Sequence, residues 1–400
     1  MALPQDNGDM LVHSSTQHPT EIQKMVALVT GRRAADVVCE VPRMGGGFGG
    51  KESQATQWAA FAALGTHFTG RACKVWLDRD RDMVQTGNRH PFWTRYEAGF
   101  DETGRITALR AHIYSDGGFS LDLSGAVLDR ALFHLDNAYY LPACHLEGRV
   151  CATNLPSNTA FRGFGGPQGM VVVEDAINRF AERTGMDPAV VRARNHYGDA
   201  PRNRAPYGQE IPAPRLDRIW EQLRRSADYD ARRQAIEAFN EDSVWIKRGI
   251  GYQPVKFGIS FTASVLNQAG ALVLVYADGT IHLNHGGTEM GQGLHSKMLA
   301  VCADAFGVDV DNIRAMNTRT DKIPNTSATA ASSGSDLNGQ AVADACRQIT
   351  DRMRPVAADL LGVSPDEVLF DEGHAIAGSE RVPFAEVAKQ CWLRQVSLHS

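Results

Sequence analysis

Residues 45–52 read GGGFGGKE, follow the apolar run DVVCEVPRM and precede SQATQWAAFAAL, whose composition is helical. A strand, a glycine loop ending in Gly-Lys and a helix form the layout of a phosphate-binding P-loop. In that motif a Ser or Thr hydroxyl follows the lysine and binds magnesium, whereas this chain has Glu52. A carboxylate there would repel phosphate, and no apolar run ending in Asp stands out downstream. We therefore interpret the loop as a site for another ligand.

The chain has four loops of small residues, and each precedes a predicted helix. They are MGGGFGGKE (44–52), FRGFGGPQG (161–169), HGGTEMGQG (285–293) and TSATAASSGS (326–335). Glycine lets the main chain approach a ligand closely, and the start of a helix favours negative charge. Any one of these loops, taken alone, is better explained as a simple turn between elements. Together, the four loops favour main-chain N–H groups gathered around an anionic ligand.

Strands and helices alternate with mixed connections, which predicts an α+β (mixed α/β) fold. A charged helix expected over residues 215–240 is a plausible bridge, so we divide the chain into segments 1–245 and 246–400. Hydrophobic periodicity and turn residues predict the other elements. They are strands at 36–42 and 72–78, hairpins at 93–118 and 271–287, a helix capped by Thr20, and helices over 53–66, from about 169, 294–305 and 342–356.

Composition excludes several classes of protein. The net charge of −5 gives no basic field for nucleic acid, and no apolar run approaches the ~20 residues of a membrane span. The seven cysteines include no C-x-x-C pair, which argues against a zinc ribbon or an iron–sulfur cluster held by this chain alone. Scattered thiols suit a reducing compartment, and the N-terminus lacks the pattern of a signal peptide. We therefore expect a cytoplasmic protein.

Six segments, in this order, resemble the molybdenum-binding subunit or domain of xanthine dehydrogenases, within the xanthine oxidase and aldehyde oxidase superfamily. They extend from about residue 5 to the end of the chain. The segments are HSSTQHPTEIQ, RMGGGFGGKES, LDRALFHLDNAYYLP, TNLPSNTAFRGFGGPQGM, KFGISFTASVLNQAGALVLVYADGTIHLNHGGTEMGQGLHSKM and PNTSATAASSGSDLNGQAV. The resemblance implies two molybdopterin-binding subdomains, here 1–245 and 246–400, truncated at the N- and C-terminal ends respectively.

The resemblance also implies a cofactor and a reaction. Molybdopterin would support oxidative hydroxylation of purines, hypoxanthine to xanthine and xanthine to urate, with water as the oxygen source. Electrons would leave through iron–sulfur clusters and FAD on a partner chain or a missing region, so a hetero-oligomer is expected. Three alternatives stay open: an aldehyde or N-heterocycle oxidase of the same superfamily, a metal-free binding or assembly module and, least favoured, a P-loop ATPase.

Residue roles follow from the same resemblance. Each of these side chains taken alone has an ordinary structural explanation, such as a core aromatic or a surface ion pair, and His285 is interpreted as structural. The resemblance places Glu52 and Arg130 on the purine during catalysis, where a guanidinium stabilises negative charge that develops on the ring. The remaining roles are Gln17, Phe48, Gly49, Arg162 and Ala331 around the molybdenum, Gln292 and Ser332 on the pterin, and Phe164, Phe261 and Thr262 on the substrate.

Two parts of the family pattern are missing. The motif GEPP, whose glutamate acts as general base, does not occur in these residues, and the family's segment upstream of PQDNGDM is absent. Loss of a general base costs about 10²–10⁴ in rate. We therefore expect these residues to be a fragment that is inactive alone.

Overall fold

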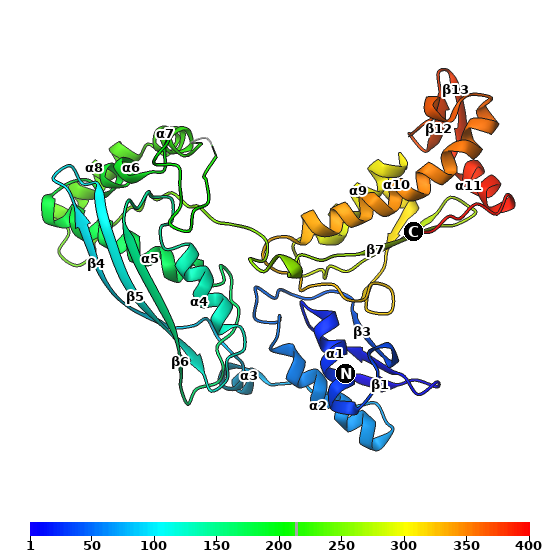
Figure 1. Cartoon of the computed structure of the whole chain (residues 1–400), viewed down its shortest axis with the longest axis horizontal. Coiled ribbons are helices and arrows are strands. Elements are labelled where there is room, and N and C mark those ends of the chain that lie inside the picture. The colour runs from blue at the N-terminus through cyan, green and yellow to red at the C-terminus, as the bar shows by residue number, and fades with distance from the viewer. Residues whose placement is uncertain (213–214) are drawn as a thin grey trace. The chain divides into compact units, whose positions relative to one another are not determined.

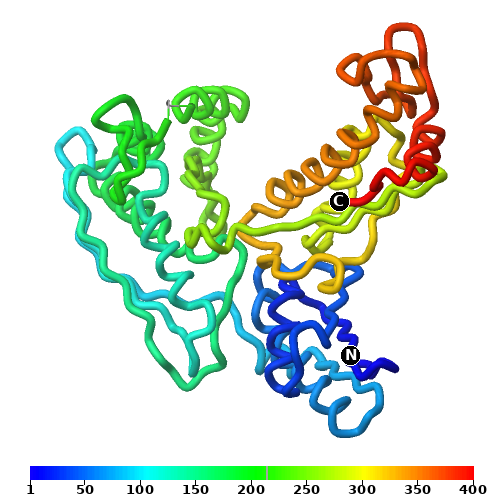
Figure 2. Tube along the Cα trace, turned by 45° about the vertical axis from the view of Figure 1, so that its right-hand side comes forward, coloured from blue at the N-terminus to red at the C-terminus, as the bar shows by residue number. Residues whose placement is uncertain are grey.

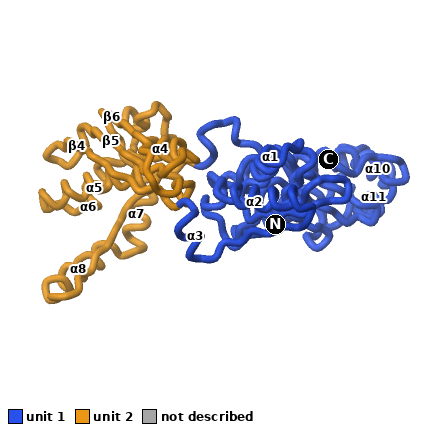
Figure 3. The backbone as a smooth tube through the Cα atoms, turned by 90° about the horizontal axis from the view of Figure 1, so that it is seen from below, with its two compact units in different colours: residues 1–87, 259–400 blue, residues 88–258 orange. Residues whose placement is uncertain are grey.

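The computed structural model describes residues 1–212 and 215–400 (Figure 1). Contacts divide the chain into two compact units, residues 1–87 with 259–400 and residues 88–258 (Figure 3). Helices and strands are mixed throughout, which confirms the α+β class. The first unit is discontinuous in sequence because strand β3 (Val37–Val41) pairs with β10 (Thr318–Arg319). The contiguous subdomains 1–245 and 246–400 thus differ from the compact units and stay a prediction.

The N-terminal part of the first unit is a four-stranded sheet with the order β1-β2-β3-β10. Strands β1 (Ala2–Pro4) and β2 (Met10–His13) are antiparallel, whereas β2 and β3 are parallel. Parallel neighbours need a crossover, which α1 (Pro19–Thr30) provides, and α2 (Ala55–Thr69) packs against α1.

The C-terminal part of the first unit has a three-stranded sheet and two long helices. The sheet contains β7 (Ala271–Val275), β8 (Ile281–His285) and β9 (Ile313–Ala315). The helices α9 (Leu294–Phe306) and α10 (Gly334–Leu361) lie side by side and bury the predicted apolar stripes. A small sheet and a last helix follow: β11 (Leu369–Asp371), β12 (His374–Ala377), β13 (Glu380–Pro383) and α11 (Phe384–Leu393). The C-terminus returns to β7, where Ser400 N donates to Val273 O at 3.1 Å (Figure 2).

The second unit is a long three-stranded sheet with helices on one face (Figure 1). The predicted hairpin is present as β4 (Phe92–Phe100) and β5 (Ile106–Gly118), and β6 (Cys144–Ala152) joins β5 in parallel. Helices α4 (Ser124–Phe133) and α5 (Gly166–Thr184) pack together. Their approach requires Gly169, because a Cβ there would lie 2.0 Å from Ala131 O. The remaining helices are α6 (Pro188–Asn195), α7 (Leu216–Ser226) and α8 (Tyr229–Asp242).

Three local predictions are wrong. Residues 72–78 form only an isolated bridge, Ala2 with Cys73, and are followed by the short helix α3 (Arg79–Gln85). Thr20 is no cap, since α1 begins at Pro19, whose fixed φ suits a first helical position. The expected helix over 215–240 is two helices, α7 and α8, which break where Asp228 adopts φ 48°. No helix in residues 1–212 and 215–400 is long and apolar enough to span a bilayer.

Candidate functional site

Three of the four small-residue loops meet in the first unit. Met44 N donates to Glu289 O at 2.9 Å, which joins the loop at 44–52 to the loop at 285–293. Thr288 N donates to Thr329 Oγ1 at 2.8 Å, which joins the second of these loops to the loop at 326–335. The structure therefore brings together small-residue segments that lie far apart in sequence. The fourth loop, residues 161–169, belongs to the second unit.

Gln17 fixes two of these loops to each other. Its side chain is only 2% exposed and lies between β2 and α1. Its Oε1 accepts from Gly49 N at 2.8 Å, and its Nε2 donates to Thr329 O at 3.1 Å. Gly47 must be glycine for this contact, because a Cβ there would lie 2.6 Å from Gln17 Oε1. The predicted residues Gln17 and Gly49 are thus in direct contact.

Several predicted cofactor positions adopt a left-handed backbone. Phe48, Ala331 and Ser332 have φ of 53°, 54° and 56°. For a residue other than glycine this conformation costs about 1–2 kcal/mol. Such strain persists only where the surroundings impose it, and it is concentrated at ligand sites. Phe48 is also 62% exposed, so an apolar ring stands in solvent next to the point where the loops meet.

The loop at 285–293 is organised by Glu289, a residue that the sequence analysis missed. Its carboxylate accepts from the main-chain N–H groups of Gly291, Gly293 and His295, at 2.8, 3.1 and 3.0 Å. Burial alone would raise the pKa of Glu289, but these N–H groups outweigh burial and lower it. A glutamate ahead of Gly-x-Gly at the start of a helix is the signal that could have identified this anchor.

Gln292 closes the same loop. Its Nε2 donates to Thr288 O at 2.9 Å and its Oε1 accepts from Met290 N at 2.6 Å. The amide keeps one further N–H for a ligand. His285, at the end of β8, is buried and lies 2.9 Å from His295 (Nε2 to Nδ1), and its interpretation as structural stays a prediction.

The predicted substrate residues of the first unit differ in burial. Glu52 is 7% exposed, and its main-chain N donates to Gly49 O at 3.1 Å. Phe261 is half-buried, and its backbone exchanges two hydrogen bonds with the Asn267 side chain, both at 3.0 Å. Thr262 is exposed. The Glu52 residue is therefore buried within its loop, whereas Thr262 lies at the surface.

Arg130, Arg162 and Phe164 lie in the second unit. Arg130 extends from α4, is 6% exposed, and donates through Nη1 to Gly258 O at 2.6 Å. Burial lowers its pKa, although a guanidinium stays charged at any physiological pH. Arg162 is exposed and its main-chain oxygen accepts from Arg89 Nη2 at 2.7 Å. Phe164 has φ 50° and is half-buried, so it repeats the strained geometry of Phe48.

The donor set around the three loops suits a polar, anionic cofactor. It consists of main-chain N–H groups, amide side chains and hydroxyl groups, which are hydrogen-bond partners rather than metal ligands. Two further buried atoms beside these loops, Thr288 Oγ1 and Asn338 Oδ1, have no hydrogen-bond partner among the described residues. Buried polar atoms are almost always paired, so a polar ligand or water fits there. Among residues 1–212 and 215–400, no three His, Cys, Asp or Glu side chains are grouped to hold a metal ion.

Comparison with known families gives two matches along the chain. A model of the molybdopterin cofactor-binding domain matches residues 1–196, and a second model with the same description matches residues 222–400.

Several curated proteins are similar in sequence. Xanthine dehydrogenase of Dictyostelium discoideum is 44% identical over 398 residues, which cover 100% of this chain and 28% of the relative. Xanthine dehydrogenase/oxidase of Felis catus is 47% identical over 356 residues, which cover 89% of this chain and 27% of the relative. The chain therefore spans little more than a quarter of the length of these relatives.

Solved structures share the fold. Quinoline 2-oxidoreductase from Pseudomonas putida 86 superposes with a TM-score of 0.84 at 20% identity, over 100% of this chain and 53% of that chain. Aldehyde oxidoreductase from Desulfovibrio gigas superposes with a TM-score of 0.72 at 26% identity, over 88% of this chain and 38% of that chain.

Proposed function

We propose, because this chain belongs to the family of molybdopterin cofactor-binding domains, that it forms the cofactor- and substrate-binding part of a molybdenum hydroxylase that oxidises purines. The observation that carries the proposal is the meeting of three small-residue loops on Gln17 and Thr329. The purine class is supported by the relatives named xanthine dehydrogenase, which are 44–47% identical to this chain. Hypoxanthine and xanthine are the proposed substrates.

The proposed cofactor is molybdopterin. When bound, it supplies the redox chemistry of the hydroxylation, while the chain supplies position and electrostatics. Gln292 and Ser332 are proposed to hydrogen-bond the pterin. The side chains and main-chain groups proposed to line the metal are Gln17, Phe48, Gly49, Arg162 and Ala331.

Glu52 and Arg130 are the proposed purine-binding pair. The Glu52 carboxylate would accept a ring N–H, and the Arg130 guanidinium would donate to an oxygen of the ring in a charge-assisted hydrogen bond. Both side chains are buried, which strengthens such bonds relative to bonds in water. The aromatic faces of Phe164 and Phe261 suit a flat heterocycle, and the Thr262 hydroxyl would donate to it.

The other parts of the proposal concern the whole protein. Electrons would pass to iron–sulfur clusters and FAD elsewhere in the same protein or on a partner, in a cytoplasmic hetero-oligomer. The 400 residues alone are proposed to be inactive, because the motif GEPP with its basic glutamate does not occur in them.

Substitution of the purine-binding pair in the holoenzyme tests the proposal. Glu52→Gln and Arg130→Met should each lower kcat/KM for xanthine by about 10²–10³, the usual effect of removing one group that stabilises developing charge. Arg110→Met is the matched control, since Arg110 forms only an exposed ion pair with Glu97 at 3.5 Å. Molybdenum content, measured by elemental analysis, should stay at the wild-type level in all three variants. A wild-type protein without molybdenum, or variants that oxidise xanthine at the wild-type rate, would contradict the proposal.

A further inference from the structure

Residues 253–258 form an irregular segment, here called the strap, that packs along the residues following α4. Asn137 bonds the strap twice, since its Nδ2 donates to Pro254 O at 3.0 Å and its Oδ1 accepts from Lys256 N at 3.2 Å. Gly258 N donates to His134 Nε2 at 3.0 Å. These contacts fix the strap against residues 134–137, one turn beyond Arg130.

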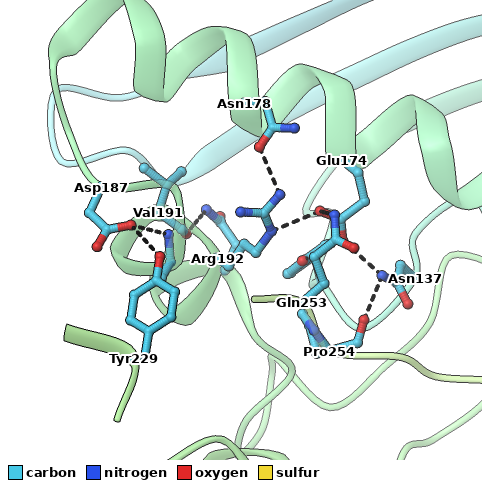
Figure 4. A network of polar contacts seen from close by, with 12 residues as sticks. Asn137, Glu174, Asn178, Asp187, Val191, Arg192, Tyr229, Gln253 and Pro254 are labelled. Atoms are coloured by element: carbon cyan, nitrogen blue, oxygen red, sulfur yellow. Dashed lines mark hydrogen bonds and ion pairs between the residues drawn. The ribbon is translucent and has the colours of Figure 1, made fainter. Parts of the chain in front are cut away.

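A buried carboxylate holds the other end of the strap. Glu174 of α5 accepts from Asn137 Nδ2 at 2.9 Å and from Gln253 Nε2 at 3.3 Å (Figure 4). Its charge is balanced by Arg192 of α6, whose Nε lies 2.8 Å from Glu174 Oε2. The Lys256 ammonium forms an ion pair with the buried Asp136. Side chains from two separate segments, residues 134–137 and α5, therefore fix the strap.

The strap in turn contacts Arg130. Gly258 O accepts from Arg130 Nη1 at 2.6 Å, and the guanidinium carbon lies 5.5 Å from the centre of the Phe257 ring. Phe257 is itself fixed against the start of α5, because a Cβ at Gly166 would lie 2.7 Å from its ring. That helix begins directly after the loop that carries Phe164. The carbonyl and the ring are both neutral, so they orient the guanidinium and leave its positive charge in place.

We infer that the strap positions the Arg130 guanidinium for a purine oxygen, and that His134 transmits this effect as a positioning residue. The inference rests on the proposed function, since it assigns the orientation of a substrate-binding side chain. A free arginine side chain loses rotamer entropy when it is ordered, which costs free energy. The strap meets this cost before substrate arrives, so substrate binds to a prepared donor.

The protonation state of His134 agrees with this role. Nε2 accepts from Gly258 N, so the proton of the neutral ring is on Nδ1, which donates to Arg130 O at 3.0 Å. Burial is the main cause that lowers the pKa of His134 to about 4, and the charges of Arg130 and Lys256 lower it further. His134 therefore stays neutral, and able to accept, throughout the physiological range.

His134→Phe and His134→Gln in the holoenzyme test the inference. Phenylalanine keeps a ring against Phe257 but cannot accept from Gly258 N, whereas the amide oxygen of glutamine can reach that N–H. We expect His134→Phe to lower kcat/KM for xanthine about 10- to 100-fold, mainly through KM, with less than a threefold change for an aldehyde substrate. His134→Gln should restore kcat/KM for xanthine to within about threefold of wild type. Hydrogen exchange of peptides covering 253–258 should accelerate in His134→Phe and return toward wild type in His134→Gln.

A second pair of variants tests the inference without changing His134, in case His134→Phe does not fold. Gly166→Ala should displace the Phe257 ring and raise KM for xanthine, whereas Gly125→Ala on α4, which has nothing within 4 Å of its Cβ position, should not. Unchanged exchange in the strap, or faster exchange with unchanged xanthine kinetics, would overturn the inference alone. A wild-type holoenzyme that fails to oxidise any purine would overturn the proposed function, and the inference with it.

Discussion

Gln17 donates through Nε2 to the main-chain oxygen of Thr329 at 3.1 Å, although 312 residues separate them in sequence. The same amide accepts from Gly49 N at 2.8 Å. One buried side chain therefore fixes the loop at 44–52 and the loop at 326–335 to each other. Because Gln17 is only 2% exposed, water cannot replace either bond.

Gln17→Met should destabilise the first unit and release both loops. Each of the two partners that loses its hydrogen bond costs about 1–3 kcal/mol, so we expect the free energy of unfolding to fall by about 2–6 kcal/mol. Gln17→Glu should retain the acceptor for Gly49 N. It should lose the hydrogen bond to Thr329 O, because a carboxylate oxygen would then face that main-chain oxygen and be repelled by it. Urea unfolding and molybdenum content of the purified holoenzyme measure the two effects.

The control for this prediction is Gln268→Met. Gln268 is exposed and donates only to Val265 O, three residues away at 2.6 Å. Its loss should change unfolding by less than about 0.5 kcal/mol, as is usual for surface substitutions. Equal effects of Gln17→Met and Gln268→Met would show that the Gln17 contact does not hold the loops.

Gly47→Ala should disrupt the same contact from the opposite side. A Cβ at Gly47 would lie 2.6 Å from Gln17 Oε1, so the amide must move away from Gly49 N. We expect a loss of molybdenum content and a destabilisation of about 1–3 kcal/mol, the range for overpacking. Gly45→Ala is a closely matched control two residues away, because nothing lies within 4 Å of its Cβ position. A Gly47→Ala protein with the molybdenum content of Gly45→Ala would contradict the role assigned to this glycine.

Local patterns in the sequence predicted most of the elements that frame the site. The stripe with Met298 and Cys302 gives the buried face of α9, and the stripe with Ile349 and Met353 gives that of α10. The hairpin turn at Asp278-Gly279 joins β7 to β8 as expected. In each of these cases the determining residues lie within one element, so periodicity and turn chemistry are sufficient.

Long-range pairing could not be predicted in this way. The pairing of β3 with β10 places residues 1–87 and 259–400 in one unit, and two residues of β10 give no periodic signal. Similarly, Gln17 was assigned to a metal environment by resemblance, yet nothing in the sequence indicates that its side chain binds Thr329. The strand predicted at 72–78 is wrong because a suitable local composition does not guarantee a neighbouring strand. Within this segment only Cys73 forms a β-bridge, with Ala2.

Arg192→Met should strongly destabilise the second unit. The Arg192–Glu174 pair is buried at 2.8 Å, and removing one partner of such a pair costs about 3–5 kcal/mol because the other charge stays buried. Arg179→Met, which breaks an exposed pair with Asp175 at 2.8 Å, should cost at most about 1 kcal/mol. Thermal unfolding monitored by near-ultraviolet circular dichroism measures the loss of stability in each of the two variants. Similar losses in the two variants would mean that Glu174 does not depend on its buried partner.

The His285–His295 pair should make the first unit sensitive to acid. Burial, followed by the neighbouring His295, lowers the pKa of His285 to about 3, against an ordinary value near 6.5. Above about pH 6.5 the ring is neutral in both the folded and the unfolded state, so its contribution to stability is fully present. As the pH falls from about 6.5 toward 3, the unfolded chain takes up a proton that the folded chain excludes, and this contribution is lost.

His285→Gln removes the titrating ring and should flatten this part of the pH profile. Between about pH 6.5 and 5, we expect the wild type to lose up to about 2 kcal/mol more of its free energy of unfolding than the variant, from 1.36 kcal/mol per pH unit. Glu289 and Arg43, the charged groups near the pair, are present in both proteins and cancel in the comparison. His67→Gln, at an exposed histidine of α2, serves as the control and should keep the wild-type slope. Parallel profiles for wild type and His285→Gln in urea unfolding would show that His285 takes up its proton as readily in the folded chain as in the unfolded one.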